Sequence, residues 1–313
     1  MDHLIDAEDG GPIAARLAEP AGDVGLEDLA SRWFHQVVIV EVSRPRRMDA
    51  LPDVLTRLRG ALGNVLLPLA SNEARDGKPC AYDPPSALDV FFREQLRIAG
   101  RHGIPKPFVL AMDAGQRTLV IRLTIFGFAC DWTLTMRDAL LAAIALVEWT
   151  KDARPLAAET LTVRSCKIIT APGIDVPPSP DAVDLVFETP VDASASDLLL
   201  FPSTVVARLA RRIDGLSRWM DLSLDVFWDE AVLIWETLDY SWSDVEKGTS
   251  TRGSRRQQRG YEYPVISGRL RIAGNLAPLW PMLLIGQTSH AGRGATAGLG
   301  RYRLEESVET GDW

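Results

Sequence analysis

The feature that most constrains the fold is an order of strand-like and helical segments that occurs in each half of the chain. A β-branched segment at 33–42 precedes an amphipathic helix at 50–70, whose leucines recur at three- and four-residue spacing. Two strands around a hairpin turn, a compact helix and a fourth strand follow, at 107–112, 119–128, 137–150 and 159–170. The first half therefore has the order β-α-β-β-α-β.

The second half repeats this order loosely after a proline-rich stretch at 171–180, which we interpret as a linker. Its segments are a strand at 183–188, a helix capped by Ser203, an inserted apolar helix at 226–238, a strand at 263–273, a helix at 276–288 and a final strand at 300–304. The pattern predicts an α+β protein with two tandem ferredoxin-like (RRM-like) domains, each an antiparallel sheet with helices on one face. The expected divisions are an N-terminal extension (1–31), an N-terminal domain (32–170), the linker (171–180) and a C-terminal domain (181–313).

Composition narrows the class of protein. The 313 residues are 46% hydrophobic and 24% charged, which is typical of a globular chain with two domains of ordinary size. Cys80, Cys130 and Cys166 are too few and too scattered for a disulfide framework or a zinc site, so we expect a reducing cytoplasm. The acidic start lacks the basic region of a secretory signal, and no apolar run is long enough to span a bilayer. We therefore expect no metal ion, no cofactor and no membrane partner.

The net charge of −8 argues against nucleic acid, but its distribution argues for it. Residues 247–303 contain ten lysines and arginines and a single acid, Glu262. Residues 304–313 contain four acids and no base. One concentrated basic segment in an acidic protein is typical of a local groove for a phosphate backbone, although a solvated basic loop has the same composition.

A glycine-rich segment lies near the C-terminus, with Gly292, Gly294, Gly298 and Gly300 around Arg293. Glycines let a backbone approach a ligand closely, and their N–H groups and a neighbouring arginine suit phosphate. The nucleotide-binding motifs do not fit, because no Gly-Lys-Ser/Thr triplet follows and too few residues remain for a dinucleotide-binding unit. The alternative is a loop that only turns the terminal strand into its sheet.

Several short segments occur in a fixed order along the chain: LRGALG at 58–63, CAY at 80–82, IPKPFVL at 104–110, FGFA at 126–129, Thr189-Pro190, LARRIDGL at 209–216, RGSRRQ at 252–257 and HAGRGATAGLGRYRL at 290–304. In this order, over residues 50–304, they resemble the CRISPR repeat-RNA endoribonucleases, the sixth Cas protein family within the RAMP superfamily. The chain departs from the family where a cysteine cluster often precedes CAY. Only Cys80 remains there, so no metal role follows from the resemblance.

The resemblance implies a protein that binds CRISPR repeat RNA, single-stranded or hairpin, and cuts the precursor within its repeats without a metal ion. In that reaction the 2′-hydroxyl attacks the adjacent phosphate and leaves a 2′,3′-cyclic phosphate and a free 5′-hydroxyl. The residues expected to contact the RNA are Arg252, Arg255, Arg256, Arg259, Gly292, Arg293, Gly294, Gly298, Gly300, Arg301 and Arg303.

Such a reaction needs a base, an acid and positive charge near the phosphorane, and histidine suits both proton transfers. The chain has four histidines. His290 directly precedes the glycine-rich segment and is the first candidate; the alternative is a histidine that interacts with a helix end. His35, at the head of the first strand, is the second candidate, although a packed or surface histidine is more common at such a place. His3 and His102 lie in loop-like sequence.

Two other functions fit parts of the same pattern. One is a non-catalytic RAMP subunit that binds guide RNA within an effector complex beside other Cas subunits, and the scarcity of histidines favours it. The other is a tandem ferredoxin-like protein with no RNA role, which the basic segment argues against. Tryptophans such as Trp228 and Trp235, seven residues apart, fit core packing better than base stacking.

Overall fold

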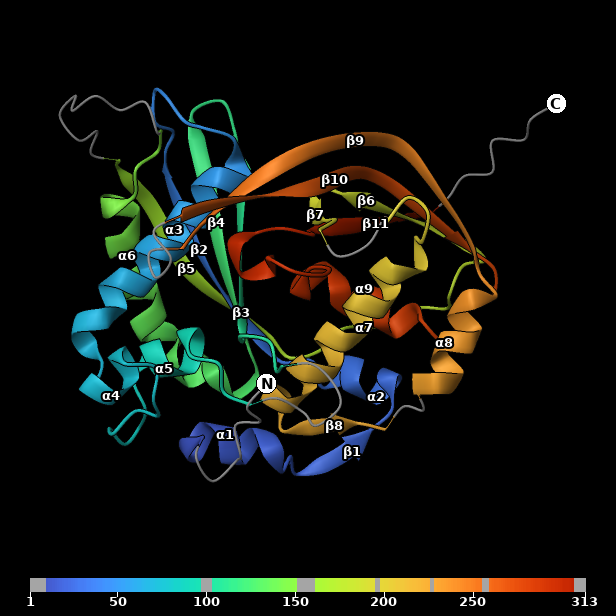
Figure 1. The fold of residues 1–313 in the computed structure, drawn as a ribbon, viewed down its shortest axis with the longest axis horizontal. Helices are drawn as coiled ribbons and strands as arrows, with labels where there is room; N and C mark the ends of the chain where they lie inside the picture. Colours follow the sequence, from blue (N-terminus) through green and yellow to red (C-terminus); the bar gives the residue numbers. More distant parts are fainter. Residues whose placement is uncertain are drawn as a thin grey trace.

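The computed structural model describes residues 10–96, 103–150, 161–194, 198–225, 228–254 and 259–306. One antiparallel sheet belongs to the N-terminal half and another to the C-terminal half, with helices packed around them (Figure 1). No helix in these ranges is long and apolar enough to cross a membrane.

The N-terminal half forms a four-stranded sheet in the order β3-β4-β2-β5. Its strands are β2 (His35–Ser43), β3 (Phe108–Ala114), β4 (Thr118–Phe126) and β5 (Val163–Ala171), and its main helices are α3 (Leu51–Leu66) and α6 (Thr133–Leu146). The two helices pack together on one face, onto which β2 directs the buried Val38, Val40 and Val42. The first strand of this half thus lies between the third and the fourth, as in the ferredoxin-like order, and the prediction is confirmed.

The C-terminal half has the same strand order, with one interruption. Its strands are β6 (Ala182–Phe187), β7 (Val191–Asp192), β9 (Asp239–Ser254), β10 (Arg259–Ala273) and β11 (Tyr302–Glu306), and its main helices are α7 (Ser203–Ser217) and α9 (Trp280–Ser289). β6 lies between β11 and β10, and β9 pairs along the other edge of β10. β7 resumes the line of β6 after a bend at Thr189-Pro190 and also pairs with β10. The bend matters for the glycine-rich segment, as shown below.

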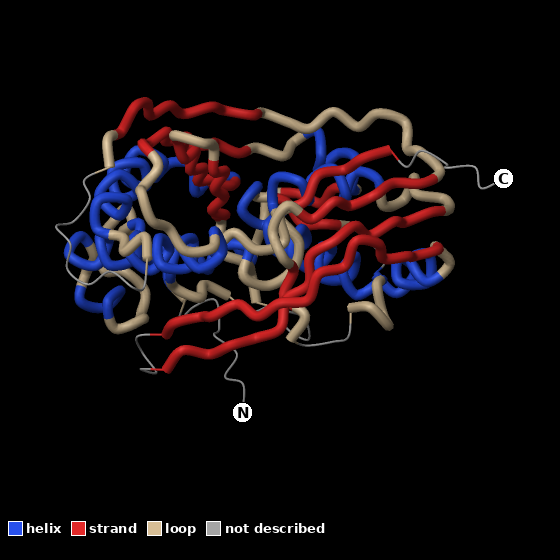
Figure 2. Tube along the Cα trace, turned by 90° about the horizontal axis from the view of Figure 1, so that it is seen from above, coloured by secondary structure: helices blue, strands red, loops and turns tan. Residues whose placement is uncertain are grey.

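β9 and β10 form a long hairpin that carries much of the basic segment. It extends from the second sheet toward the N-terminal half, where β9 packs against α3 (Figures 1 and 2). The sequence did not reveal β9, because its residues are mostly polar or glycine and lack apolar alternation.

The N-terminal extension is part of the packed structure from residue 10 onward. It forms α1 (Gly11–Ala18), β1 (Gly22–Val24) and α2 (Leu26–Ser31), and β1 pairs in parallel with β8 (Leu222–Leu224). Leu17 and Leu29 are fully buried, which explains why a weakly periodic stretch is held in place. The remaining helices are α4 (Asn72–Arg75), α5 (Ala87–Phe92) and α8 (Trp228–Glu236).

Close contacts lock the two halves together. Gly215 lies so near the first half that an added Cβ would be 2.2 Å from Pro105 Cδ, and Gly127 so near the second that its Cβ would be 1.8 Å from the Trp219 carbonyl oxygen. Trp219 Nε1 also donates to the Pro105 carbonyl at 2.9 Å. These contacts fix how the two sheets are placed, and therefore fix any site built from both.

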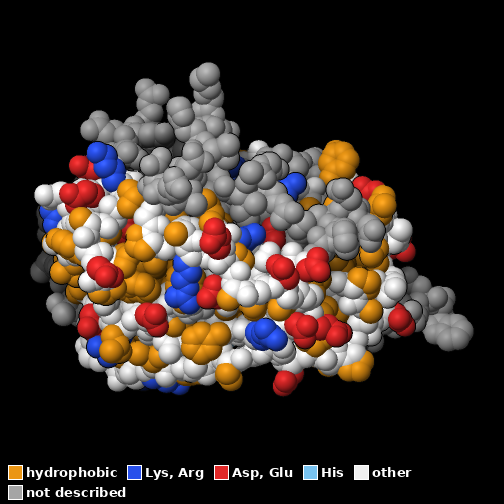
Figure 3. Space-filling model, turned by 90° about the horizontal axis from the view of Figure 1, so that it is seen from below, with side chains coloured by type: hydrophobic (Ala, Val, Ile, Leu, Met, Phe, Trp, Pro, Cys, Tyr) orange, Lys and Arg blue, Asp and Glu red, His pale blue; other side chains and the backbone are white. Residues whose placement is uncertain are grey.

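The face formed by the lower elements of Figure 1 is shown in Figure 3. Among the side chains of the described residues, acidic and hydrophobic groups are spread over it and basic groups lie scattered between them. No block of positive charge gathers on the described part of this face, so a phosphate-binding surface has to be sought elsewhere.

Candidate nucleic-acid interface

A pocket of about 390 Å³ lies where the two halves meet. The N-terminal half contributes Arg59 of α3, Glu94 and residues 103–106, while the C-terminal half contributes Arg212 of α7 and residues 292–296. Four of these side chains are cationic and one is acidic, so the pocket is electropositive in a protein of net charge −8.

The glycine-rich segment divides into two parts with different surroundings. Its second part is packed: a Cβ on Gly298 would lie 2.4 Å from Leu55 Cδ1, and one on Gly300 would lie 1.9 Å from the Ala291 carbonyl oxygen. Thr189, at the bend after β6, accepts from Arg301 N–H and donates to the Gly298 carbonyl. This part does what the alternative interpretation required, because it turns the chain into β11.

The first part, residues 292–296, faces the pocket. Gly292 has φ +78° and an open neighbourhood, since an added Cβ would meet only Arg208 Cδ at 3.8 Å. The N–H groups of residues 297–300 bond within the segment or to Pro190. Those of residues 292–296 make no hydrogen bond to another described residue, as expected where the short helix η4 (Ala295–Ala297) begins. These N–H groups thus form no hydrogen bond within the described part of the protein.

Arg212 is a buried cation at this pocket. Its side chain is packed inside the C-terminal half, and Nε donates to the Ser289 carbonyl at 2.6 Å. Nη2 has no hydrogen-bond partner among the described residues. Burial lowers the pKa of Arg212 to about 10, so the group still carries its charge at neutral pH.

Two further arginines extend the positive charge beyond the pocket. Arg208 and Arg211 lie one turn and one residue before Arg212 on α7, and the pocket residue Arg293 is exposed in the glycine-rich segment. Burial lowers the pKa of Arg208, and the nearby charges of Arg293 and Arg211 lower it further against the opposing effect of Asp192. The guanidinium groups of α7 and of the loop are thus close enough to repel one another, a cost that a bound anion would relieve.

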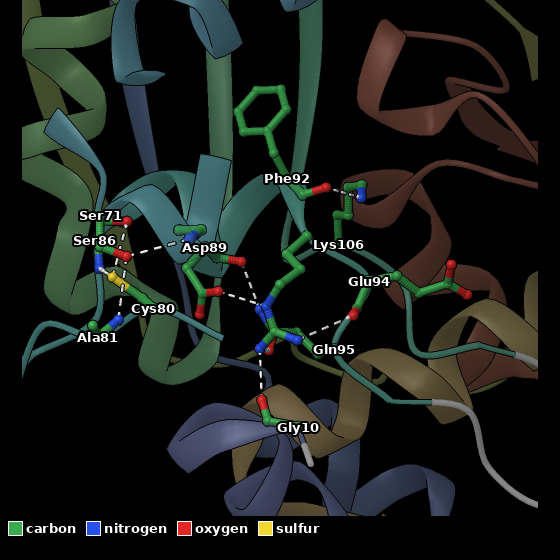
Figure 4. A network of polar contacts seen from close by, with 12 residues as sticks. Gly10, Ser71, Cys80, Ala81, Ser86, Asp89, Phe92, Glu94, Gln95 and Lys106 are labelled. Atoms are coloured by element: carbon green, nitrogen blue, oxygen red, sulfur yellow. Dashed lines mark hydrogen bonds and ion pairs between the residues drawn. The ribbon is translucent and has the colours of Figure 1, made fainter. Parts of the chain in front are cut away.

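The N-terminal half contributes two cationic side chains to the lining of the same pocket. Arg59 Nε donates to Thr296 Oγ1 at 3.0 Å, and its guanidinium lies 5.4 Å from the centre of the Phe92 ring. Lys106 Nζ donates to the Phe92 carbonyl at 2.5 Å (Figure 4). Both side chains are therefore held at the pocket by contacts of their own.

A buried polar network holds the segment that contains the pocket residue Glu94 (Figure 4). Arg93 donates to Asp89 Oδ1 at 2.5 Å, to Gln95 Oε1 at 2.5 Å and to the Gly10 carbonyl at 2.7 Å. Asp89 and Gln95 are each only 2% exposed, so the segment that carries Glu94 is fixed to α1 and α5.

The two candidate catalytic histidines are buried, whereas a general acid or base has to reach the RNA strand. His290 caps the end of α9 with φ +62° and ψ 159°, a backbone conformation that favours glycine, and its side chain is buried. Burial, followed by the charges of Arg212 and Arg301, lowers its pKa to about 3. His35 is buried beside Phe126, and burial lowers its pKa as well. Neither imidazole faces the pocket as an exposed proton donor.

The arginines at the end of the chain are engaged in ion pairs. Arg301 contacts Asp113 at 2.7 Å and Glu188 at 2.6 Å, and Arg303 contacts Glu305 at 2.5 Å. The Asp113 carboxylate also pairs with Arg122 of β4. The charges of Arg301 and Arg303 are therefore balanced by carboxylates of the protein.

The structure places only some of the remaining residues that the sequence analysis named as candidates. Arg252 and Arg259 lie in the paired ends of β9 and β10. Arg255 and Arg256, like His3 and His102, lie outside the described residues. The described ranges hold no cluster of three or more His, Cys, Asp or Glu side chains that could bind a metal ion.

Sequence reasoning did not select Arg59, Lys106, Arg208, Arg211 or Arg212. The three arginines of α7 carried a signal that could have been used, because positions i, i+3 and i+4 share one face of a helix. Arg59 and Lys106 lie in the family-like segments 58–63 and 104–110, but nothing in those segments indicates a contact with the loop, which depends on the packing of the two halves.

The C-terminal half carries a family signature: residues 185–302 match the model described as CRISPR-associated endoribonuclease Cas6. This part of the chain is similar to the Cas6 family. The matched region contains α7 and all but Arg303 of the glycine-rich segment and its flanking arginines. No curated protein matches the sequence.

Its fold is similar to that of Thermus thermophilus Cas6 (TTHB231), with a TM-score of 0.51 and 15% identity over 87% of this chain and 99% of that one. A Cas6 (TTHB231) product complex is similar too, with a TM-score of 0.50 and 16% identity over 87% of this chain and 100% of that one. At this level of identity the likeness establishes a shared fold over most of both chains.

Proposed function

We propose that this chain is a Cas6-type endoribonuclease that cuts CRISPR precursor RNA within its repeats to give guide RNAs. The observation that carries the proposal is the pocket between the two halves, where Arg59, Lys106, Arg212 and Arg293 surround free backbone N–H groups. An RNA strand that crosses the junction would place one phosphodiester among these groups.

The chemistry that fits this site is transesterification without a metal ion. The 2′-hydroxyl loses its proton and its oxygen bonds to phosphorus, while the bond from phosphorus to the 5′-oxygen breaks and that oxygen gains a proton. The products are a 2′,3′-cyclic phosphate and a 5′-hydroxyl. Arg293 and Lys106 are placed to stabilise the charge that develops on the phosphorane oxygens.

The predicted RNA-binding residues take distinct parts in this proposal. Gly292, Gly294 and Arg293 contact the strand at the pocket, while Gly298 and Gly300 hold the loop in shape. Arg252, Arg255, Arg256 and Arg259 would contact phosphates farther along the RNA. Arg301 and Arg303 serve chiefly the ion pairs described above.

His290 and His35 contribute to this proposal through structure, because a buried imidazole with a lowered pKa stays neutral and does not reach an RNA strand. This observation favours a second candidate function, a non-catalytic RAMP subunit that holds guide RNA beside other Cas subunits. The two candidates share the RNA-binding pocket and differ only in whether the bound phosphodiester is cut.

One assay separates them. The purified protein is incubated in EDTA with labelled repeat RNA and, as a matched control, with the same RNA carrying a 2′-deoxy nucleotide at the cut site. Cleavage in EDTA that the deoxy substitution abolishes supports the enzyme, whereas tight binding of both RNAs without a cut supports the subunit. Absence of RNA binding contradicts both.

A cytoplasmic location follows from the proposed substrate, a transcript, and is supported by three free thiols. Cys80, Cys130 and Cys166 form no disulfide. Free thiols are typical of proteins in a reducing compartment.

A further inference from the structure

A second pocket, of about 450 Å³, lies in the C-terminal half between the residues that follow β7 and the middle of the β9–β10 hairpin. Six apolar side chains, at positions 193, 198, 199 and 264–266, line it together with Ser194, Gly248 and Lys247. Mainly apolar walls with a few polar groups that fix orientation are typical of a ligand site. This pocket shares no lining residue with the pocket between the two halves.

Two polar side chains give the apolar pocket hydrogen-bond donors. Lys247 is exposed, and no aspartate or glutamate lies in the lining to balance its charge. Ser194 is exposed as well, and its backbone N–H donates to Asp192 Oδ1 at 2.7 Å, which holds the turn that carries the hydroxyl. A ligand with a flat apolar body and acceptor atoms on its edge can use both the walls and the donors, whereas an apolar side chain can use only the walls.

Contacts within the C-terminal half connect this second pocket to the cationic groups beside the glycine-rich segment. Arg208, which lies close enough to Arg293 to be repelled by its charge, donates through Nη1 to the carbonyl of Asp192, the residue before the first lining position. Val265 of the lining packs with Leu299 of the glycine-rich segment. An RNA strand that passes Arg293 and Arg208 would therefore reach the mouth of the second pocket.

We propose that this second pocket binds one unstacked nucleobase of the RNA, with the ring against the apolar side chains and the edge of the base on Lys247 and Ser194. The inference rests on the proposed RNA substrate and adds to the phosphate contacts a site that reads the identity of a base. Guanine O6 and uracil O4 are carbonyl acceptors for an ammonium group, whereas adenine has no carbonyl oxygen, so Lys247 favours guanine or uracil.

The test uses the full chain and a set of repeat RNAs that carry a 2′-deoxy nucleotide at the cut site. Each RNA also carries one abasic nucleotide, which keeps its ribose and phosphate but lacks the base, at a different position. Fluorescence anisotropy measures the dissociation constants. For the wild type, we expect loss of the bound base to weaken binding about tenfold.

Ser194→Phe fills the pocket from an exposed position. This variant should bind the intact RNA about tenfold more weakly than the wild type does, but should bind one of the abasic RNAs equally well, because that RNA has no base to place in the pocket. Ser241→Phe is the matched control, since this exposed serine of β9 does not line the pocket, and it should bind every RNA as the wild type does.

Lys247→Ala tests the same coupling without added bulk, and it also serves if Ser194→Phe does not fold. It should weaken binding of the intact RNA about threefold to tenfold and leave binding of the same abasic RNA unchanged. Lys78→Ala, at an exposed lysine of the N-terminal half that lines neither pocket, is the matched control and should show no such difference.

The outcomes separate the base pocket from the proposed function. If the folded variants lose the same affinity for the intact RNA and for every abasic RNA, or lose none, the base pocket is overturned and an apolar side chain of a protein becomes the better occupant. Wild-type protein that binds no repeat RNA contradicts the proposed function and the base pocket together. Ser194→Phe should also keep the wild-type salt dependence of binding, because it removes no phosphate contact.

Discussion

The two parts of the glycine-rich segment have similar compositions and opposite surroundings. Residues 292–296 have an exposed arginine, free N–H groups and open space beside Gly292. Residues 298–303 have packed glycines and arginines that are already paired with carboxylates. Neither a glycine nor an arginine by itself therefore identifies a phosphate site. The deciding property is whether the hydrogen-bond donors of the candidate site already have partners inside the protein.

The comparison predicts its largest effect at Gly300. Gly300→Ala brings a Cβ within 1.9 Å of the Ala291 carbonyl oxygen at a φ of +70°, so the loop has to shift. We expect a loss of about 4 kcal/mol in the free energy of unfolding, measured by urea denaturation. Gly292→Ala is the matched control and should lose only about 1 kcal/mol, because it meets left-handed strain without a clash. Equal losses would remove the distinction between the two parts.

A lower pH should destabilise the packed core around the glycine-rich segment rather than change the charge of the pocket. The pKa of His290 is about 3 when folded, against about 6.5 for an unfolded histidine, so unfolding takes up a proton between these values. The free energy of unfolding should fall by about 1.4 kcal/mol per pH unit as the pH drops through this window, with a further loss from His35.

His290→Gly tests the source of that slope, because glycine accepts the backbone conformation of residue 290 and cannot titrate. Between pH 6 and pH 4, the change in the free energy of unfolding per pH unit should be smaller than in the wild type by about 1.4 kcal/mol, which corresponds to one proton. An unchanged slope would mean that His290 is protonated in the folded protein, and its role as an acid would have to be considered again.

Arg293→Ala should weaken repeat-RNA binding about tenfold and lower the slope of log Kd against log salt by about one, as expected for one lost phosphate contact. Fluorescence anisotropy over a series of salt concentrations measures both quantities. The free energy of unfolding should stay within about 0.5 kcal/mol of wild type, because the side chain is exposed. An unaltered salt slope would show that Arg293 does not contact the backbone.

The smallest effect is expected for Arg303→Ala, the counterpart in the packed part. Arg303 is half exposed and already paired with Glu305 and Glu188, so its removal should weaken RNA binding only slightly. We expect less than a threefold change in the dissociation constant under the same conditions. A loss as large as that of Arg293→Ala would mean that the ion pairs open when RNA binds.

The sequence predicted the architecture well because periodicity and turn residues are local signals. The leucines of α3 and the β-branched residues of β2 give their elements directly. β9 was missed because its pairing with β10, rather than its own composition, makes it a strand. The role of residues 10–31 was missed for a similar reason, since β1 depends on a partner about 200 residues away.

The site was predicted only in part, for physical reasons. The loop glycines and Arg293 were found from their local pattern, whereas Arg59 and Lys106 reach the pocket only through the contact between the two halves. Burial also cannot be read from a single histidine in a sequence. The pKa of His290 is lowered first by burial and then by the nearby charges of Arg212 and Arg301, so its charge depends on the folded environment.

The pairing of β1 with β8 bears on how the protein is made. Residues 222–224, against which residues 22–24 dock, are synthesised about 200 residues after them. At ordinary elongation rates this leaves the first segment without its strand partner for about 10–40 s. β1 therefore has no strand partner until the second domain has emerged, although α1 can already contact the first domain through Gly10 and Arg93. A chaperone that shields Leu29 during that interval would improve the yield of folded protein.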